Sequence, residues 1–403
     1  MDKLLLILGL VTVTMALPYE NFGGFELPPN YVKTPLGEGI DKSSMKLLKV
    51  AYDLAKDKNV VSSPLGLMIL LSMFNNGAGP KTKEEITKFL GGSTDFKQTS
   101  DSYRDLSDRL SQMNPDALTV ANKVYVSNMY SLAETFTDVV RSYRSEVETL
   151  NFSNPEEAAA IINKWADEKT KGNIKKPVDP SILSPDVAAA LFNVIYFKGH
   201  WHVPFKSEET KDKDFHVSKD SVVQKPTMHL LQSLYYTESP ELGARMVELP
   251  YKERGFRMVV VLPNEVDGLP SVLEKAAEKG LLNEVFKLSP AGADVDLDIP
   301  KFDIKTKLDF NEILPELGVT SLFTEPAVGI VKDQAVKVSK AFQEAFIKVD
   351  EEGATAGAFT GAIAVATSSI SQPPPPMKFT VDHPFLYLIL FEDKVLFAGT
   401  YVI

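Results

Sequence analysis

Apolar positions in the first half of the chain recur mostly at the spacing of α-helices. Over residues 43–55 they fall on one face of a 3.6-residue period, which predicts a helix packed against a core. Ser63 and Pro64 precede an almost wholly apolar run over residues 65–74. Proline is common in the first turn of a helix, and a helix that is apolar all round has to be buried. Further helices are expected over residues 82–90 and 100–113 and from Asn154 onward.

The second half of the chain has patterns that are typical of β-strands. Residues 188–197 form an unbroken apolar stretch, which predicts a strand buried on both faces. Two terminal strands are expected over 385–391 and 395–402, joined by a turn at 392–394. Other strands are expected over residues 120–126, 245–249, 257–262, 295–299 and 302–305. Helices followed by strands, with no regular strand–helix alternation, indicate an α+β fold in a single domain.

The first sixteen residues are typical of a secretory signal peptide. Lys3 supplies a positive start, residues 4–15 are almost wholly apolar, and Ala16 is the small residue expected before a cleavage site. The apolar run is too short to span a bilayer. We therefore predict cleavage after Ala16, secretion to the extracellular space, and a single domain over residues 17–403. Residues 17–41 are rich in glycine and proline and are expected to form a loose arm.

The composition narrows the classes of function. With 54 Asp and Glu against 43 Lys and Arg the net charge is −11, so nucleic acid and anionic membranes are not expected as partners. The chain has no cysteine, which excludes disulfides, thiol catalysis and zinc–thiolate sites. It also lacks phosphate-binding and dinucleotide-binding glycine motifs and a nucleophile elbow, so we expect no catalytic residues, no metal and no cofactor. A single sequon makes Asn151 a candidate for glycosylation.

A long uncharged segment lies just before the terminal strands. Residues 353–377 contain no charged side chain, and part of this segment has a period of two, with Thr360 in the one gap between alanines. The alanines are at 354, 356, 358, 362, 364 and 366. A period of two is the pattern of a β-strand, here with one uniformly small face that could slide over a packed core. The alternative is a flexible tether in which the alanines have no structural meaning.

At this segment the sequence resembles the serpin family. Residues 349–353, Val-Asp-Glu-Glu-Gly, are similar to the serpin hinge, and residues 379–401 resemble the C-terminal signature of the family. Further motifs follow in the family's order at residues 59–65, 152–155, 162–165, 170–172, 193–199 and 249–251. The resemblance therefore extends over residues 40–403.

The resemblance implies a serpin fold with three β-sheets, about nine helices and a reactive-centre loop exposed at about residues 351–378. In serpins a protease cuts this loop and forms an acyl-enzyme, and the cut loop inserts into the main β-sheet and traps the protease. Counting as in the family places the cleaved bond between Thr367 and Ser368. Because the segment before Phe379 is longer than is common, the bond could also lie elsewhere between Ala366 and Ser371. The hinge would comprise Glu351, Glu352, Gly353, Ala354, Thr355 and Ala356.

The resemblance also implies two groups of interacting side chains. A hydrogen-bonded cluster at the point where the main sheet parts would consist of Ser63, Asn193 and Gln343. An ion pair at the hinge would join Lys301 and Glu351. Gly66 replaces the serine that is usual in the family, and Gln343 replaces a histidine. Because an amide both donates and accepts hydrogen bonds, the cluster is expected to persist.

The loop sequence restricts the target protease. Without Lys or Arg in residues 353–377, a trypsin-like target is not expected, and Phe359 lies too near the hinge for chymotrypsin-like cleavage. An elastase-like serine protease and a papain-like cysteine protease both remain open. The alternative function is a non-inhibitory serpin with a carrier, storage or chaperone role. Residues 96–112 lack a clustered basic face, so we expect no heparin-type activation. Separately, we expect the protein to be a monomer.

Overall fold

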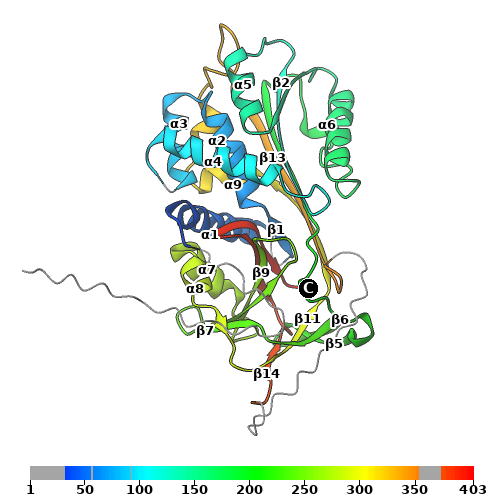
Figure 1. The fold of residues 1–403 in the computed structure, drawn as a ribbon. Coiled ribbons are helices and arrows are strands. Elements are labelled where there is room, and N and C mark those ends of the chain that lie inside the picture. The colour runs from blue at the N-terminus through cyan, green and yellow to red at the C-terminus, as the bar shows by residue number, and fades with distance from the viewer. Residues whose placement is uncertain (1–31, 56–57, 92, 354–373) are drawn as a thin grey trace, which may run out of the picture.

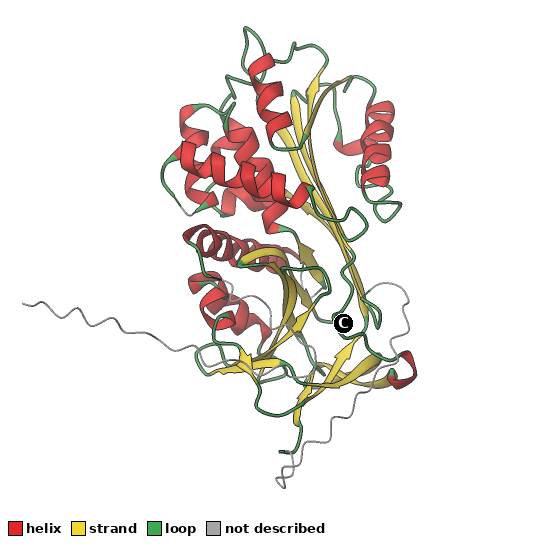
Figure 2. Ribbon diagram, viewed as in Figure 1, coloured by secondary structure: helices red, strands yellow, loops and turns green. Residues whose placement is uncertain are grey.

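The computed structural model describes residues 32–55, 58–91, 93–353 and 374–403. Within these residues the chain forms three β-sheets and ten α-helices, two of which have only four residues. Most of the helices gather toward one end of the molecule, while the four-stranded sheet lies at the opposite end (Figure 2). The prediction of an α+β fold with three sheets is confirmed.

One sheet has five strands in the order β12–β13–β4–β2–β3, and we call it the main sheet. Its strands are β12 (Phe302–Asp309), β13 (Val338–Val349), β4 (Ala189–Phe197), β2 (Leu118–Ser127) and β3 (Glu146–Leu150). Its two central long strands, β13 and β4, run parallel, with Gln343 opposite Asn193. As predicted for this apolar stretch, all nine residues of β4 are buried.

The second sheet has seven strands in the order β1–β16–β15–β9–β8–β7–β10. These strands are β1 (Val60–Ser62), β16 (Lys394–Tyr401), β15 (Phe385–Phe391), β9 (Phe256–Pro263), β8 (Ala244–Pro250), β7 (Tyr235–Ser239) and β10 (Ser289–Pro290). The third sheet consists of β14 (Met377–Thr380), β11 (Val295–Pro300), β6 (Ser221–Gln232) and β5 (Lys211–Ser218). The predicted terminal strands are thus adjacent inner strands of the seven-stranded sheet, with a turn between them.

Helices cover both faces of the main sheet (Figure 1). The helices are α1 (Pro35–Ala55), α2 (Pro64–Asn75), α3 (Pro80–Leu90), α4 (Phe96–Ser111), α5 (Glu134–Ser142), α6 (Pro155–Lys169), α7 (Leu269–Lys279), α8 (Leu282–Val285), α9 (Phe310–Glu316) and α10 (Ser321–Thr324). All twelve residues of α2 are buried, as its sequence predicted. On the opposite face, α6 places Ile162 and Trp165 in one apolar cluster with Tyr125 and Phe192 of the main sheet.

The prediction of a loose arm over residues 17–41 is wrong for its last part, because α1 begins at Pro35. Proline fits the first turn of a helix, and Ile40 is fully buried on the packed face of α1. Just before the helix, the backbone N–H and the hydroxyl of Thr34 donate to Asp393 at 2.7 and 2.6 Å. Residues 1–31, with the predicted signal peptide, lie outside the described residues. No helix in the described part of the chain is long and apolar enough to cross a membrane.

Candidate functional site

Gln343, in the middle of β13, is the centre of a buried polar cluster. Its side-chain oxygen accepts a hydrogen bond from the backbone N–H of Ser63 at 2.7 Å. Its NH₂ group donates to the carbonyl of Ser63 and to Oδ1 of Asn193, both at 2.8 Å. All three residues are at most 1% exposed. The three residues that the sequence grouped therefore lie in direct contact, and Gln343 bridges α2 to the seam between β13 and β4.

Local structure at Ser63 and Gly66 sets the position of this cluster. Ser63 is the N-cap of α2, and its hydroxyl donates to the carbonyl of Leu396 and accepts from the N–H of Gly66. A Cβ atom on Gly66 would lie 2.8 Å from the amide atoms of Asn193. Because Gly66 has no Cβ atom, the amide of Asn193 can occupy the space where the side chain of a serine would lie.

The cluster extends one strand further than the sequence indicated. Nδ2 of Asn193 donates to Oδ1 of Asn122 at 2.7 Å, and the two residues are paired across β2 and β4. Asn122 is 4% exposed. Sequence analysis missed it, although a lone amide within an otherwise buried strand is a usable signal. A polar line therefore crosses the main sheet at one level, from α2 through three strands.

The chain reverses direction directly after β13. The N–H of Gly353 donates to the carbonyl of Asp350 at 3.3 Å, which closes a four-residue turn. Gly353 has φ = 61°, and a Cβ atom there would lie 2.4 Å from the backbone nitrogen of Trp201. Only glycine fits this position. The indole N–H of Trp201 also donates to the carbonyl of Asp350 at 2.8 Å, so the turn is held against the end of β4.

An ion pair holds the same turn from another side. Nζ of Lys301 lies 2.6 Å from Glu351, and the hydroxyl of Thr210 donates to the same carboxylate at 2.7 Å. Burial alone would raise the pKa of Glu351, but the hydrogen bonds from Lys301 and Thr210 outweigh it and hold this pKa below its ordinary value. The expected partners Lys301 and Glu351 are thus in contact. Thr210 is an additional partner that no sequence pattern indicated.

Comparison with known proteins identifies the architecture around these contacts. The sequence matches the family model described as "Serpin (serine protease inhibitor)" over residues 38–403. The chain belongs to the serpin family. It is therefore a member of a family of protease inhibitors rather than of enzymes.

Individual serpins agree with this assignment. Antitrypsin from Bombyx mori is 33% identical over 370 residues, which cover 91% of this chain and 94% of the relative. A solved structure, Serpin48 from the insect Tenebrio molitor, superimposes with a TM-score of 0.80 at 31% identity, and the match covers 91% of this serpin and 98% of that chain. The structure of human thyroxine-binding globulin in complex with thyroxine matches with a TM-score of 0.80 at 25% identity and the same coverage. The fold thus occurs in both an insect serpin and a thyroxine-binding globulin.

The remaining residues that the sequence singled out have different positions in this serpin. Glu352 is exposed in the hinge turn, and its N–H donates to the side chain of Asp350. Asn151 is exposed directly after β3, with its side-chain oxygen accepting from the N–H of Ser153. Several predicted loop residues lie outside the described residues: Ala354, Thr355, Ala356, Ala366, Thr367, Ser368 and Ser371.

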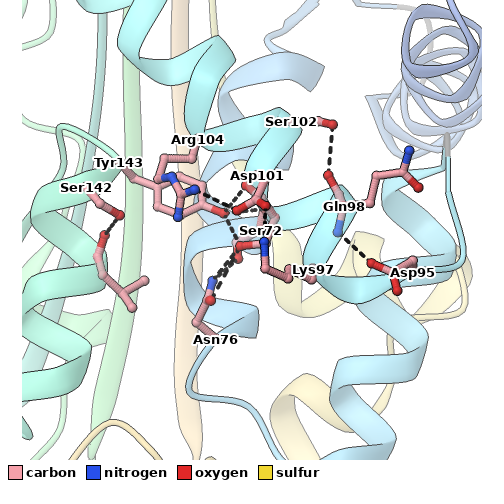
Figure 3. A network of polar contacts seen from close by, with 12 residues as sticks. Ser72, Asn76, Asp95, Lys97, Gln98, Asp101, Ser102, Arg104, Ser142 and Tyr143 are labelled. Carbon is pink, nitrogen blue, oxygen red and sulfur yellow. Dashed lines mark hydrogen bonds and ion pairs between the residues drawn. The ribbon is translucent and has the colours of Figure 1, made fainter.

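A second polar network connects α2, α4 and α5 (Figure 3). The hydroxyl of Tyr143 lies 2.9 Å from the hydroxyls of both Ser72 and Ser100, and all three side chains are buried. On the outer side of α4, Lys97 and Arg104 both pair with Asp101, at 2.7 and 2.6 Å (Figure 3). These cations are therefore compensated within the helix.

Proposed function

We propose that this serpin is a secreted protease inhibitor that traps its target covalently. The protease would cut the bond between Thr367 and Ser368, or another bond between Ala366 and Ser371. The freed segment would then insert into the main sheet between β13 and β4. The observation that carries this proposal is the hinge turn Asp350–Gly353, which reverses the chain beside a pair of parallel strands.

Strand direction favours insertion at this seam. A strand that continues from the turn would run antiparallel to β13. Because β4 is parallel to β13, the same strand would also be antiparallel to β4. Antiparallel pairs are joined by tight turns and have well-aligned hydrogen bonds, whereas parallel pairs are slightly less stable per residue. Insertion would therefore replace one parallel pair by two antiparallel pairs.

The register of the turn predicts which side chains would face the core. Asp350 and Gly353 are opposite each other in the turn, so a continued hairpin would set Val349 opposite residue 354. Directly opposite residues share one face of a sheet. Val349 and Ile347 are buried in the core, whereas Lys348 is exposed. We call the alternate alanines from residue 354 to residue 366 the alanine stripe. The side chains of this stripe would therefore turn inward, and that of residue 355 would turn outward.

The same register would bring Thr360 opposite Gln343. Thr360 is the one residue that interrupts the alanine stripe. Insertion has to break the hydrogen bond between Gln343 and Asn193, because the new strand passes between them. A threonine hydroxyl both donates and accepts, so it can satisfy the two amides that insertion separates. Thr360, the one residue of the stripe that is not alanine, would thus lie at the level of the polar cluster in the main sheet.

We further propose that the target is either an elastase-like serine protease or a papain-like cysteine protease, since the loop has no Lys or Arg. Heparin-type activation is not part of the proposal, because Lys97 and Arg104 of α4 are paired with Asp101, and Arg109 is paired with Glu392. We also propose that the protein is a monomer and that the exposed Asn151 is glycosylated on secretion.

A carrier role is the second candidate function. It is supported by the structural likeness to thyroxine-binding globulin and by Phe359, a large residue in the loop. A carrier would be cut by proteases without trapping them. Denaturing gel electrophoresis after incubation with elastase and papain distinguishes the two roles, because an acyl-enzyme complex survives denaturation.

The sharpest test of insertion uses two neighbouring arginine substitutions. In Ala354→Arg the new charge would have to be buried opposite Val349 without a partner, which costs several kcal/mol. Insertion would slow while cleavage of the loop would not. We expect the moles of serpin consumed per mole of trapped protease to rise about tenfold or more, in line with that burial cost.

Thr355→Arg is the matched control, because its side chain would be opposite the exposed Lys348 and remain in water. Its stoichiometry should stay close to that of the parent protein. If Ala354→Arg traps protease as efficiently as the parent, the loop does not act by insertion and the carrier role is the better explanation.

A further inference from the structure

A cavity of about 770 Å³ opens between the C-terminal end of α4, the start of β2 and two turns of the seven-stranded sheet. This volume is in the range of sites that bind ligands or short peptide segments. Its apolar lining includes Val32, Met113, Leu118, Phe197, Phe256 and Phe391. Leu118 and Phe197 are a cross-strand pair of β2 and β4, so the cavity borders the end of the main sheet that is near the hinge.

The lining of this cavity holds three cations and three carboxylates, and one of the cations has no ion pair among the described residues. Arg109 pairs with Glu392 at 2.5 Å, and Lys394 pairs with Asp393. Arg254, also in the lining, is exposed and has no carboxylate partner among the residues that the structure describes. The third carboxylate of the lining, Glu253, lies 2.9 Å from Nδ1 of His200, so Arg254 is left to pair with a carboxylate of an apolar occupant.

The chain itself enters at the rim of this cavity. Val32 is the first described residue, lines the cavity and is 76% exposed. Two residues later, Thr34 is hydrogen-bonded through its backbone and its hydroxyl to Asp393 in the cavity wall. The residues that precede Val32 are therefore tethered directly beside the cavity.

The sequence of residues 17–31 has the chemistry that the cavity favours. It contains four aromatic residues among fifteen, two glutamates and no Lys or Arg. The aromatic residues are Tyr19, Phe22, Phe25 and Tyr31, and the glutamates are Glu20 and Glu26. Segments that stay unfolded are typically poor in aromatic residues, so this one has apolar surface to bury.

We propose that residues 17–31 dock into this cavity of the same molecule, with Phe22 and Phe25 on the apolar lining and Glu26 beside Arg254. The tether between Phe25 and Val32 is long enough, since seven residues span about 23 Å when extended. A short tether also gives an effective concentration in the millimolar range, so weak contacts suffice for docking. The proposal assumes cleavage after Ala16 and does not depend on protease inhibition.

Because the chain has no cysteine, paired cysteine substitutions test this proposal cleanly. In the chain that begins at Leu17, Phe25→Cys is combined with Met113→Cys, a half-buried position in the cavity lining. The control combines Phe25→Cys with Met129→Cys, a 68% exposed position beyond the far end of β2. With a short bis-maleimide, docking should give about tenfold more intramolecular cross-linking at Met113→Cys than at Met129→Cys.

Two further substitutions identify the contacts. Phe22→Ser and Arg254→Ser, each added to the Phe25→Cys/Met113→Cys protein, should lower the cross-linking yield several-fold. Lys252→Ser is the matched control for the loss of charge, because Lys252 is exposed and is not in the cavity lining. Equal yields at the two cysteine positions, yields unchanged by Phe22→Ser and Arg254→Ser, or cross-linked dimers as the main product would each overturn the proposal.

Discussion

Inner strands of the seven-stranded sheet and of the main sheet are both buried, but they are held to their neighbours differently. All seven residues of β15 are buried, and six of them are wholly apolar, the exception being Tyr387. In the main sheet the central seam between β13 and β4 is crossed by polar side chains, Gln343 and Asn193. Separating apolar surfaces costs about 25 cal/mol per Å². A hydrogen bond adds only about 1 kcal/mol net, because folding exchanges hydrogen bonds with water for hydrogen bonds within the protein.

We infer from this comparison that, of these two sheets, the main sheet is the one that could part and close again around a new strand. The amides of Gln343, Asn193 and Asn122 need polar partners, but they do not need each other. The hydroxyl of an inserted threonine can hydrogen-bond to these amides. No such replacement of partners is available for the apolar contacts between β15 and its neighbours. The following substitutions test this difference.

The largest effect is expected for Leu388→Ala in β15. Leu388 is 1% exposed, and truncation of such a leucine destabilises a protein by about 2–5 kcal/mol. Because β15 would stay in place during insertion, the thermal midpoint should fall for both the uncleaved and the loop-cleaved protein. Ile403→Ala, at a 49% exposed residue, is the control and should have little effect. A fall confined to the uncleaved form would contradict the assigned role of this sheet.

Gln343→Leu should have a smaller and more selective effect. It leaves the N–H of Ser63 and the side-chain oxygen of Asn193 without their partner, at about 1–3 kcal/mol for each buried group. The closed seam between β13 and β4 loses more stability than the inserted form does. Conversion of the uncleaved protein to an inserted or polymeric form should therefore accelerate. Native gels after incubation at raised temperature measure this rate. A rate equal to that of the parent protein would show that the cluster does not hold the seam closed.

Gln343→His tests the same position through pH. Gln343 does not titrate, so conversion of the parent protein should change little between about pH 5 and 8. A buried histidine is disfavoured in its charged form, and lowering the pH protonates it. Conversion of the variant should therefore become faster as the pH falls through about 6. A steep rise of the same kind in the parent protein would mean that other groups control the seam.

The smallest effect is expected for Lys301→Met at the hinge. Lys301 is one-third exposed, so its ion pair with Glu351 contributes at most about 1 kcal/mol. The pKa of Glu351 is lowered in the folded protein, so this contribution is present above its ordinary pKa of 4.5 and is lost as the pH falls through the folded-state pKa. The difference between the variant and the parent in denaturant unfolding should thus be full at pH 7 and should shrink as the pH falls below 4.5. A difference that stays constant as the pH falls would assign the effect to packing instead.

Much of the fold was predictable because it depends on local patterns. The apolar run of α2 and the helix-starting pair Ser63-Pro64 need no information from other parts of the chain. The same holds for the unbroken apolar stretch of β4. The start of α1 was not predictable in this way, because glycine and proline in residues 17–41 outweighed the local signal. Burial of Ile40 and the contacts of Thr34 with Asp393 stabilise that region from distant parts of the chain.

The sequence alone was sufficient to assign the family, the buried strands and the hinge motif, and the family resemblance implied the pairing of Ser63, Asn193 and Gln343. Only the tertiary structure revealed Asn122 and Thr210 as further partners and the cavity beside Val32. Motifs and periodicity are properties of neighbouring residues and survive in the unfolded chain. Contacts between residues far apart in sequence depend on strand register and on how helices pack on sheets. They exist only once the whole chain has folded.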